Sequence, residues 1–173
     1  MKDISPPRLI LFGGSCLEAS DYRNKYSIYK PNKTGSGAAV QFDFNKDKRC
    51  VFVEAAKQTT PPAGSTALHA FDWGNKLVFK LAATDLGKIL TVLEGRVKNV
   101  DLFHDPSKGG YTLSAETKNS MLGLAKGDYG FFLKVSSQAR DGSVQAINMG
   151  VSEDEAAVLR VLLARAVEGI YGW

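Results

Sequence analysis

The stretch of sequence that decides the fold is Asn99-Val100-Asp101-Leu102-Phe103-His104-Asp105-Pro106-Ser107-Lys108-Gly109. Its first half has the composition of a short strand, and the Asp-Pro pair that follows favours a turn. By itself this pattern would suit many proteins. It becomes informative through its position, because Phe71-Asp72-Trp73, an amphipathic strand and a short helix precede it in that order.

The sequence before this stretch predicts four strands and then a helix. The clearest strand covers residues 38–44, in which apolar residues alternate with others, as expected for a half-buried strand. The other three strands are predicted at 26–30, 50–56 and 76–82. For the helix, Thr84 is the predicted N-cap, and Gly95 is the predicted end.

The sequence from residue 100 onward repeats this order. Strands are predicted at 100–104, 111–116, 129–136 and 144–150. Asp141-Gly142 is a hairpin signal between the last two strands, and Ser152-Glu153-Asp154-Glu155 is a capping box that opens a helix with one apolar stripe. Four strands and a helix, twice over, predict an α+β fold with two four-stranded antiparallel β-sheets and two helices.

Length and composition narrow the class of protein. The 173 residues suffice for one well-buried domain, predicted at 25–173, and residues 1–24 are predicted to form an N-terminal arm. The net charge of +4 weakly favours a polyanionic partner. Cys16 and Cys50 have no neighbouring ligand pattern, so we expect free thiols and no bound metal or other cofactor.

Targeting signals are also not evident. No apolar run approaches the ~20 residues of a membrane span, and the start of the chain lacks the pattern of a signal or transit peptide. We therefore expect a cytoplasmic protein without a membrane partner, or one of the nucleus or an organelle matrix if a leader has been removed.

Taken in order, these segments resemble the Whirly family of single-stranded DNA-binding proteins. The matching residues are Tyr26-Ser27-Ile28-Tyr29-Lys30, Gly37-Ala38-Ala39-Val40, Phe71-Asp72-Trp73, Lys76-x-Val78-Phe79-x-Leu81, Thr84-x-x-Gly87-x-Ile89, Phe103-His104-Asp105-Pro106-x-Lys108-Gly109 and Gly172-Trp173. The resemblance implies roughly perpendicular sheets and a homotetramer assembled through the C-terminal helices. It also implies that single-stranded DNA lies along the sheets with little sequence preference. Similar folds occur in kinetoplastid mitochondrial RNA-binding proteins, a transcriptional coactivator and phage single-strand-binding proteins.

One segment departs from the family. Plant members carry a compact Lys-Gly-Lys-Ala-Ala-Leu motif after the first strand, whereas here a longer loop leads from Lys30 to Ala38-Ala39. Because the plant lysine helps tetramers join into larger assemblies, such assemblies are not implied for this chain. The absence of a long plant-type transit region would suit a phage or bacterial member.

Binding of a single strand requires cations for the phosphates and aromatic faces for the bases. Residues of these two types on predicted sheet faces and adjacent loops are the predicted nucleic-acid contacts: Tyr29, Lys30, Lys33, Trp73, Lys76, Lys80, Phe103, Lys108, Tyr111, Phe132 and Lys134. Each has a plainer interpretation. The lysines would simply be solvated, Phe103 and Phe132 would pack under a neighbouring loop or subunit, and Trp73 would be structural.

Catalysis is not predicted. His104-Asp105 has the residue types of an acid–base pair, but adjacent strand residues point to opposite faces, and Asp105-Pro106 favours a turn. No phosphate loop or nucleophile motif accompanies it. We therefore expect a single-stranded DNA-binding protein that acts in replication, recombination or repair. An RNA-binding or annealing protein, and a coactivator or protein-interaction module, remain the alternatives, and no small-molecule substrate is expected.

Overall fold

The computed structural model describes residues 25–105 and 117–173. Within them, the first part of the chain forms β1 (Lys25–Lys30), β2 (Ala38–Asn45), β3 (Cys50–Thr59), β4 (Ala70–Phe71), the 3-10 helix η1 (Trp73–Asn75), β5 (Leu77–Leu81) and α1 (Ala83–Leu93). The second part forms β6 (Asn99–His104), β7 (Thr117–Gly127), β8 (Gly130–Ala139), β9 (Val144–Val151) and α2 (Glu153–Tyr171). The predicted arm at 1–24 lies outside the described residues.

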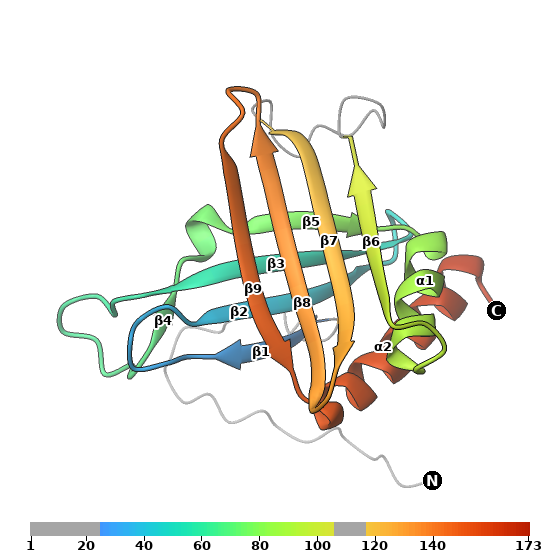
Figure 1. The fold of residues 1–173 in the computed structure, drawn as a ribbon, viewed down its shortest axis with the longest axis horizontal. Helices are drawn as coiled ribbons and strands as arrows, with labels where there is room; N and C mark the ends of the chain where they lie inside the picture. Colours follow the sequence, from blue (N-terminus) through green and yellow to red (C-terminus); the bar gives the residue numbers. More distant parts are fainter. Residues whose placement is uncertain (1–24, 106–116) are drawn as a thin grey trace, which may run out of the picture.

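The strands form two antiparallel sheets. In the first sheet the long strands have the order β1-β2-β3-β5, and the second sheet has the order β6-β7-β8-β9. The strands of the second sheet cross those of the first at a steep angle, and both helices lie towards one side of the crossing (Figure 1). The predicted α+β architecture of two antiparallel sheets and two helices is therefore confirmed.

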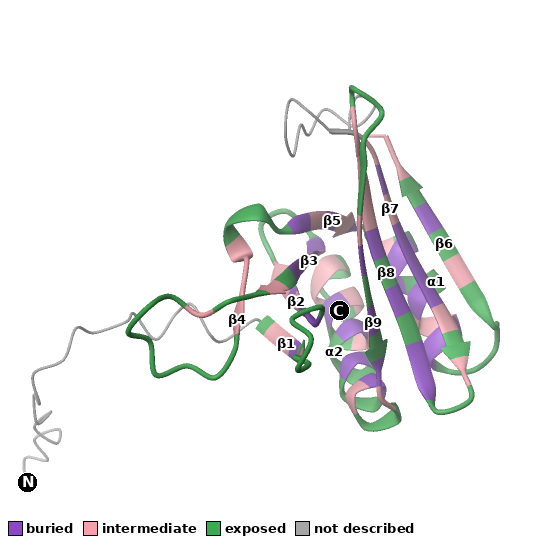
Figure 2. Ribbon diagram, turned by 60° about the vertical axis from the view of Figure 1, so that its left-hand side comes forward, coloured by how far each residue is buried: buried purple, intermediate pink, exposed green. Residues whose placement is uncertain are grey.

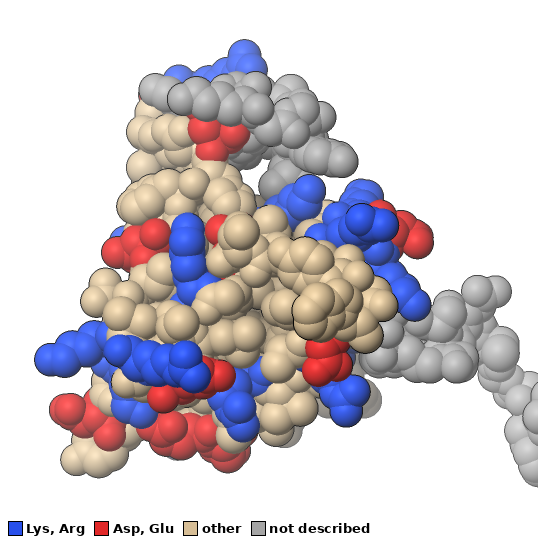
Figure 3. All heavy atoms as spheres, turned by 90° about the vertical axis from the view of Figure 1, so that its right-hand side faces the viewer, with Lys and Arg blue, Asp and Glu red and all other residues tan. Residues whose placement is uncertain are grey.

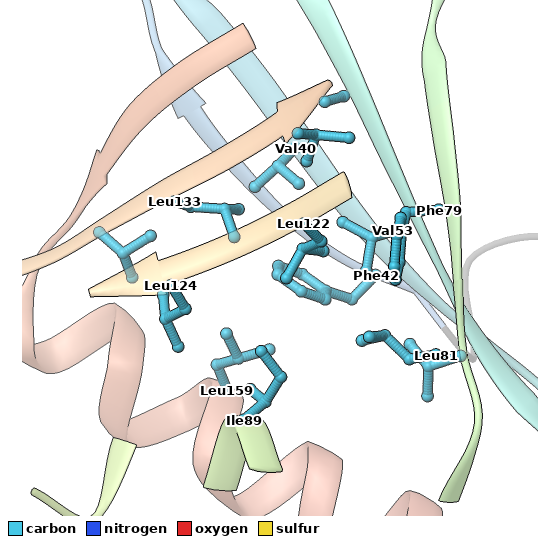
Figure 4. Close-up of a cluster of buried hydrophobic side chains, with 14 of the residues drawn as sticks. Val40, Phe42, Val53, Phe79, Leu81, Ile89, Leu122, Leu124, Leu133 and Leu159 are labelled. Carbon is cyan, nitrogen blue, oxygen red and sulfur yellow. The ribbon is translucent and has the colours of Figure 1, made fainter. Parts of the chain in front are cut away.

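One apolar core holds these parts together. The inner faces of both sheets and the inward faces of α1 and α2 contribute to a single cluster of buried side chains. Figure 4 labels Val40, Phe42, Val53, Phe79 and Leu81 from the first sheet, Leu122, Leu124 and Leu133 from the second, Ile89 from α1 and Leu159 from α2. The helices also pack against each other, so they close one side of the space between the sheets.

Period-two alternation turns every second residue of each long strand towards the core. In β8, Phe131 and Leu133 are buried, whereas Phe132 between them is 66% exposed. Buried and exposed bands alternate in the same way along the second sheet (Figure 2). The outer faces of both sheets therefore point away from the core.

Two local predictions need correction, and one strand was not predicted. The second strand of the second sheet is β7 at Thr117–Gly127, and the strand predicted at 111–116 lies outside the described residues. The first sheet also has a short fifth strand, β4, in what was predicted to be a loop. Helix α1 begins at Ala83, so Thr84 lies in its first turn; there the Asp85 carboxylate accepts a hydrogen bond from the Ala82 backbone N–H at 3.0 Å.

Replacing Leu122 with Ala should lower the free energy of unfolding by about 2–5 kcal/mol, because this side chain is 1% exposed between the two sheets. Leu68→Ala is the matched control, because Leu68 is 88% exposed, and its effect should stay within about 0.5 kcal/mol. Urea denaturation followed by circular dichroism measures both. Equal losses in the two variants would contradict the assigned core.

Candidate nucleic-acid interface

The solvent-facing side of the second sheet gathers exposed aromatic and polar side chains. Cross-strand partners point to the same side of a sheet. The pairings therefore define the β6–β9 outer face as Asn99, Asp101, Phe103, Met121, Gly123, Ala125, Phe132, Lys134, Ser136, Ala146, Asn148 and Gly150. The face is continuous across the four strands.

These residues form three rows that run across the strands. The first row is Asn99, Ala125, Phe132 and Gly150; the second is Asp101, Gly123, Lys134 and Asn148; the third is Phe103, Met121, Ser136 and Ala146. Phe103 and Phe132 are 73% and 66% exposed. Their rings stand among smaller neighbours, which is the arrangement that base stacking requires.

The β6–β9 outer face is hollowed beside both rings. A depression of about 510 Å³ lies next to Phe103 and includes Met121, Ser136 and Val144 in its lining. A second depression of about 480 Å³ lies next to Phe132 and Lys134. Both are open to solvent, so the surface offers shallow recesses of the kind that a flat base can enter from outside.

The predicted residues of the first sheet lie on a different surface. Tyr29 is 52% exposed on the outer side of β1, with its ring centroid 5.5 Å from that of Phe71. Lys80 lies on the outer side of β5, opposite Phe52 of β3. Because the two sheets share a core, these residues are not brought together with Phe103, Phe132 and Lys134.

Two predicted phosphate contacts are engaged by carboxylates. Lys76 Nζ lies 2.7 Å from Glu54 Oε1 on the neighbouring strand. Lys30 Nζ lies 2.7 Å from Glu155 Oε1 in the first turn of α2. Both lysines therefore have a structural partner, which weakens their case as phosphate contacts.

The same Glu155 caps α2. Its Oε2 accepts a hydrogen bond from the Ser152 backbone N–H at 2.9 Å, which is the bond that a capping box makes at this position. Burial by itself would raise the pKa of Glu155, but the hydrogen bonds from Lys30 and Ser152 outweigh it, and the pKa lies below its ordinary value. The ionised carboxylate therefore ties β1 to the start of α2.

The remaining predicted contacts occupy varied positions. Lys33 is exposed on the loop between β1 and β2. Trp73 is half-buried in η1. Lys108 and Tyr111 lie outside the described residues. The structure thus unites Phe103, Phe132 and Lys134 on one face and places the other described candidates elsewhere.

The histidine of the opening motif has a structural partner. His104 Nε2 lies 3.2 Å from Asp85 Oδ2 of α1, and its ring stacks on Phe79 at a centroid distance of 4.3 Å.

Burial raises the pKa of the Cys50 thiol, which disfavours the reactive thiolate. Within the described residues, no three His, Cys, Asp or Glu side chains converge as metal ligands would.

The helical side of the molecule has mixed charge. Lys and Arg side chains are interspersed with Asp and Glu around a central uncharged area (Figure 3). On α2, Val158, Val161 and Leu162 are 43–50% exposed. Neither α1 nor α2 combines the length and the apolar character that crossing a bilayer would need.

Comparison with known proteins decides the family. The family model described as Whirly transcription factor matches residues 32–162, which is most of the chain. The chain belongs to the Whirly family. A Whirly relative in Zea mays, a chloroplastic single-stranded DNA-binding protein called WHY1, is 28% identical over 112 residues, which cover 64% of this chain. The match spans only 41% of the maize protein.

Solved structures show the same fold. The plant transcriptional regulator PBF-2 superposes with a TM-score of 0.64 at 23% identity, covering 86% of this chain and 82% of that one. A guide-RNA-binding protein complex bound to its RNA gives a TM-score of 0.64 at 18% identity, covering 89% and 96%. Of these proteins, the maize relative is a single-stranded DNA-binding protein and the guide-RNA-binding complex holds RNA.

Several residues of the outer face escaped prediction. Met121 and Gly123 were missed because β7 was not predicted, since apolar or small residues occupy both of its faces. Asp101 and Asn148 were missed because carboxylates and amides neither neutralise phosphates nor stack on bases. Period-two alternation was the signal that would have found them, because it places Asp101 on the same side of β6 as Phe103, and Asn148 lies opposite Lys134.

Replacing Glu155 with Gln should lower the free energy of unfolding at neutral pH by about 0.5–2 kcal/mol, because it weakens both the α2 cap and the bond to Lys30. The folded-state pKa of Glu155 lies below its ordinary value of 4.5. This stabilisation is therefore present above pH 4.5 and is lost as the pH falls through the folded-state value. Thermal unfolding between neutral and acidic pH checks this.

Glu94→Gln provides the control, because Glu94 is exposed after the end of α1 and its ion pair among the described residues is with Arg96, two positions along the chain. Its effect should be small at every pH. A wild-type advantage over the Glu155 variant that persisted unchanged in acid would contradict the assigned role of the carboxylate.

Proposed function

We propose that this protein binds single-stranded DNA on the β6–β9 outer face with little sequence preference. The observation that carries the proposal is the pair of exposed rings, Phe103 and Phe132, on a continuous face that also presents Lys134. Bases stack on aromatic rings regardless of sequence, at about 1–3 kcal/mol each, and lysine neutralises phosphate.

The spacing of the face suits a single strand better than a duplex. Successive rows lie two residues apart along each strand, which is about 7 Å. Bases in B-form DNA are stacked about 3.4 Å apart within each strand. Bases lying on rings in different rows would therefore be splayed apart, which an unpaired strand permits and a duplex resists.

The cellular role proposed is protection of single strands during replication, recombination or repair. The maize relative supports this, because it is a single-stranded DNA-binding protein. Its chloroplastic location favours an organelle matrix over the cytoplasm for this chain as well.

RNA is the second candidate ligand, favoured by the fold shared with the guide-RNA-binding complex. Competition between matched DNA and RNA oligonucleotides separates the two.

We also propose a homotetramer assembled through α2. Val158, Val161 and Leu162 expose apolar surface on this helix, next to an apolar groove of about 230 Å³ that Phe42, Phe44 and Leu162 help to line. A second copy would bury this surface, and a closed ring of copies would bury it fully.

Phe103→Ala and Phe132→Ala should each weaken binding to oligothymidine by about tenfold, the loss expected for one stacked base. Lys134→Ala should flatten the dependence of log affinity on log salt by about 0.7. Leu68→Ala and Lys46→Ala, both at exposed positions outside this face, are the matched controls. Fluorescence anisotropy over a salt series measures all five. A variant that carries both Phe103→Ala and Phe132→Ala and keeps wild-type affinity would contradict the proposal. Wild-type protein that binds duplex DNA as tightly as single-stranded DNA would also contradict it.

Val161→Glu should convert the oligomer to a monomer, because it places a charge on the exposed apolar side of α2. Val144→Glu makes the same change at a residue that is 63% exposed in the second sheet, and it should leave the oligomer intact. Light scattering after size-exclusion chromatography gives the mass of each. A monomeric wild type, or an unchanged Val161 variant, would show that α2 is not the interface.

A further inference from the structure

The middle row of the β6–β9 outer face presents two groups that stacking and charge neutralisation do not require. Beside the Lys134 ammonium it carries the Asp101 carboxylate and the Asn148 amide, and the three groups come from three different strands. Within the described residues, none of these three groups has a hydrogen bond or an ion pair to another protein group. A carboxylate here repels phosphate, so general binding to a polyanion does not account for it.

Gly123 leaves a slot between the charged residues. It lies between Asp101 and Lys134 in the row, and adjacent strands are about 4.8 Å apart, so the two flanking backbones are separated by about 10 Å. A Cβ atom on Gly123 would lie 2.7 Å from Asp101 Oδ1, so the carboxylate itself lies over the glycine, at the edge of the recess.

The slot opens into the depression beside Phe132. This depression of about 480 Å³ is lined by Asp101, Gly123, Phe132, Lys134 and Asn148 among others. It therefore combines an exposed aromatic ring, a double hydrogen-bond acceptor and a cationic donor around one recess. Those are the elements with which proteins bind the edge of an unpaired base.

We propose that this recess binds guanine bases of a single strand in preference to the other bases. Guanine presents N1–H and the N2 amino group side by side, and the two oxygens of the Asp101 carboxylate accept both. Its O6 is the acceptor nearest to these donors, and it meets the Lys134 ammonium. Phe132 lines the other end of the recess, where its ring lies over Gly127.

The other bases match the recess less well. Adenine and cytosine each offer one amino group beside a ring nitrogen that repels a carboxylate, and thymine offers one N–H between two carbonyl groups. In a duplex the N1 and N2 donors of guanine are already paired, so the recess reads only an unpaired base. This inference rests on the proposed function, and it adds a preference at one position of a broadly sequence-tolerant surface.

The test compares oligothymidine with the same oligonucleotide carrying isolated guanines, and with a third in which inosine replaces each guanine. Inosine keeps N1–H and lacks the N2 amino group. Wild-type protein should bind the guanine oligonucleotide about 5- to 10-fold more tightly than oligothymidine, as one bidentate contact allows. The inosine oligonucleotide should lose most of that gain. Fluorescence anisotropy at fixed salt measures all three.

Asp101→Asn should abolish the guanine preference and raise the affinity for oligothymidine, because it removes a negative charge that repels phosphate. Asp47→Asn, in the exposed turn between β2 and β3, makes the same change elsewhere and should keep the preference. Gly123→Ala places a methyl group in the slot and should also reduce the preference, although the carboxylate is retained.

The outcomes separate this inference from the proposed function. Salt-sensitive binding to oligothymidine without a guanine preference, or a preference that survives in the Asp101 variant, would overturn the guanine site and leave single-strand binding intact. Failure to bind any of the three oligonucleotides would overturn both.

Discussion

The apolar core between the two crossed sheets is the constraint on which the rest of the structure depends. One face of every long strand and the inward faces of both helices are buried in this core, as Leu122 and Leu159 illustrate. Because each sheet has only one inner face, the outer faces must meet solvent or another molecule. The exposure of Phe103 and Phe132 is therefore compatible with a fully packed interior, and it marks surface that folding leaves available for binding.

The architecture was predictable wherever a strand alternates clearly. β2, β5 and β8 were found in this way, and the capping box marked the start of α2 at Glu153. β7 was not, because Met121, Gly123 and Ala125 on its outer side are as apolar or as small as a buried face would be. β4 is only two residues long and has no periodicity to detect. Crossing of the two sheets is a tertiary property, and only the family resemblance indicated it.

Predicting the site was harder, because it depends on partners distant in sequence. Alternation placed Phe132 and Lys134 together on the exposed side of β8. Nothing local showed that Lys30 pairs with a carboxylate 125 positions away, or that Lys76 pairs with one 22 positions away. Lysines of equal appearance in the sequence therefore differ in the structure. An acidic residue such as Asp101 was not predicted, because a carboxylate repels phosphate.

The strict two-residue period of β8 also shapes how this protein can evolve. Side chains on its outer side contribute little to the free energy of unfolding. Substitutions there can therefore change affinity or base preference with little loss of stability. Insertion of a single residue would instead turn Phe132 inward and Leu133 outward, exchanging binding face and core in one step. Variation among descendants of this chain should therefore accumulate as replacements along the strand, with changes in length confined to the hairpins.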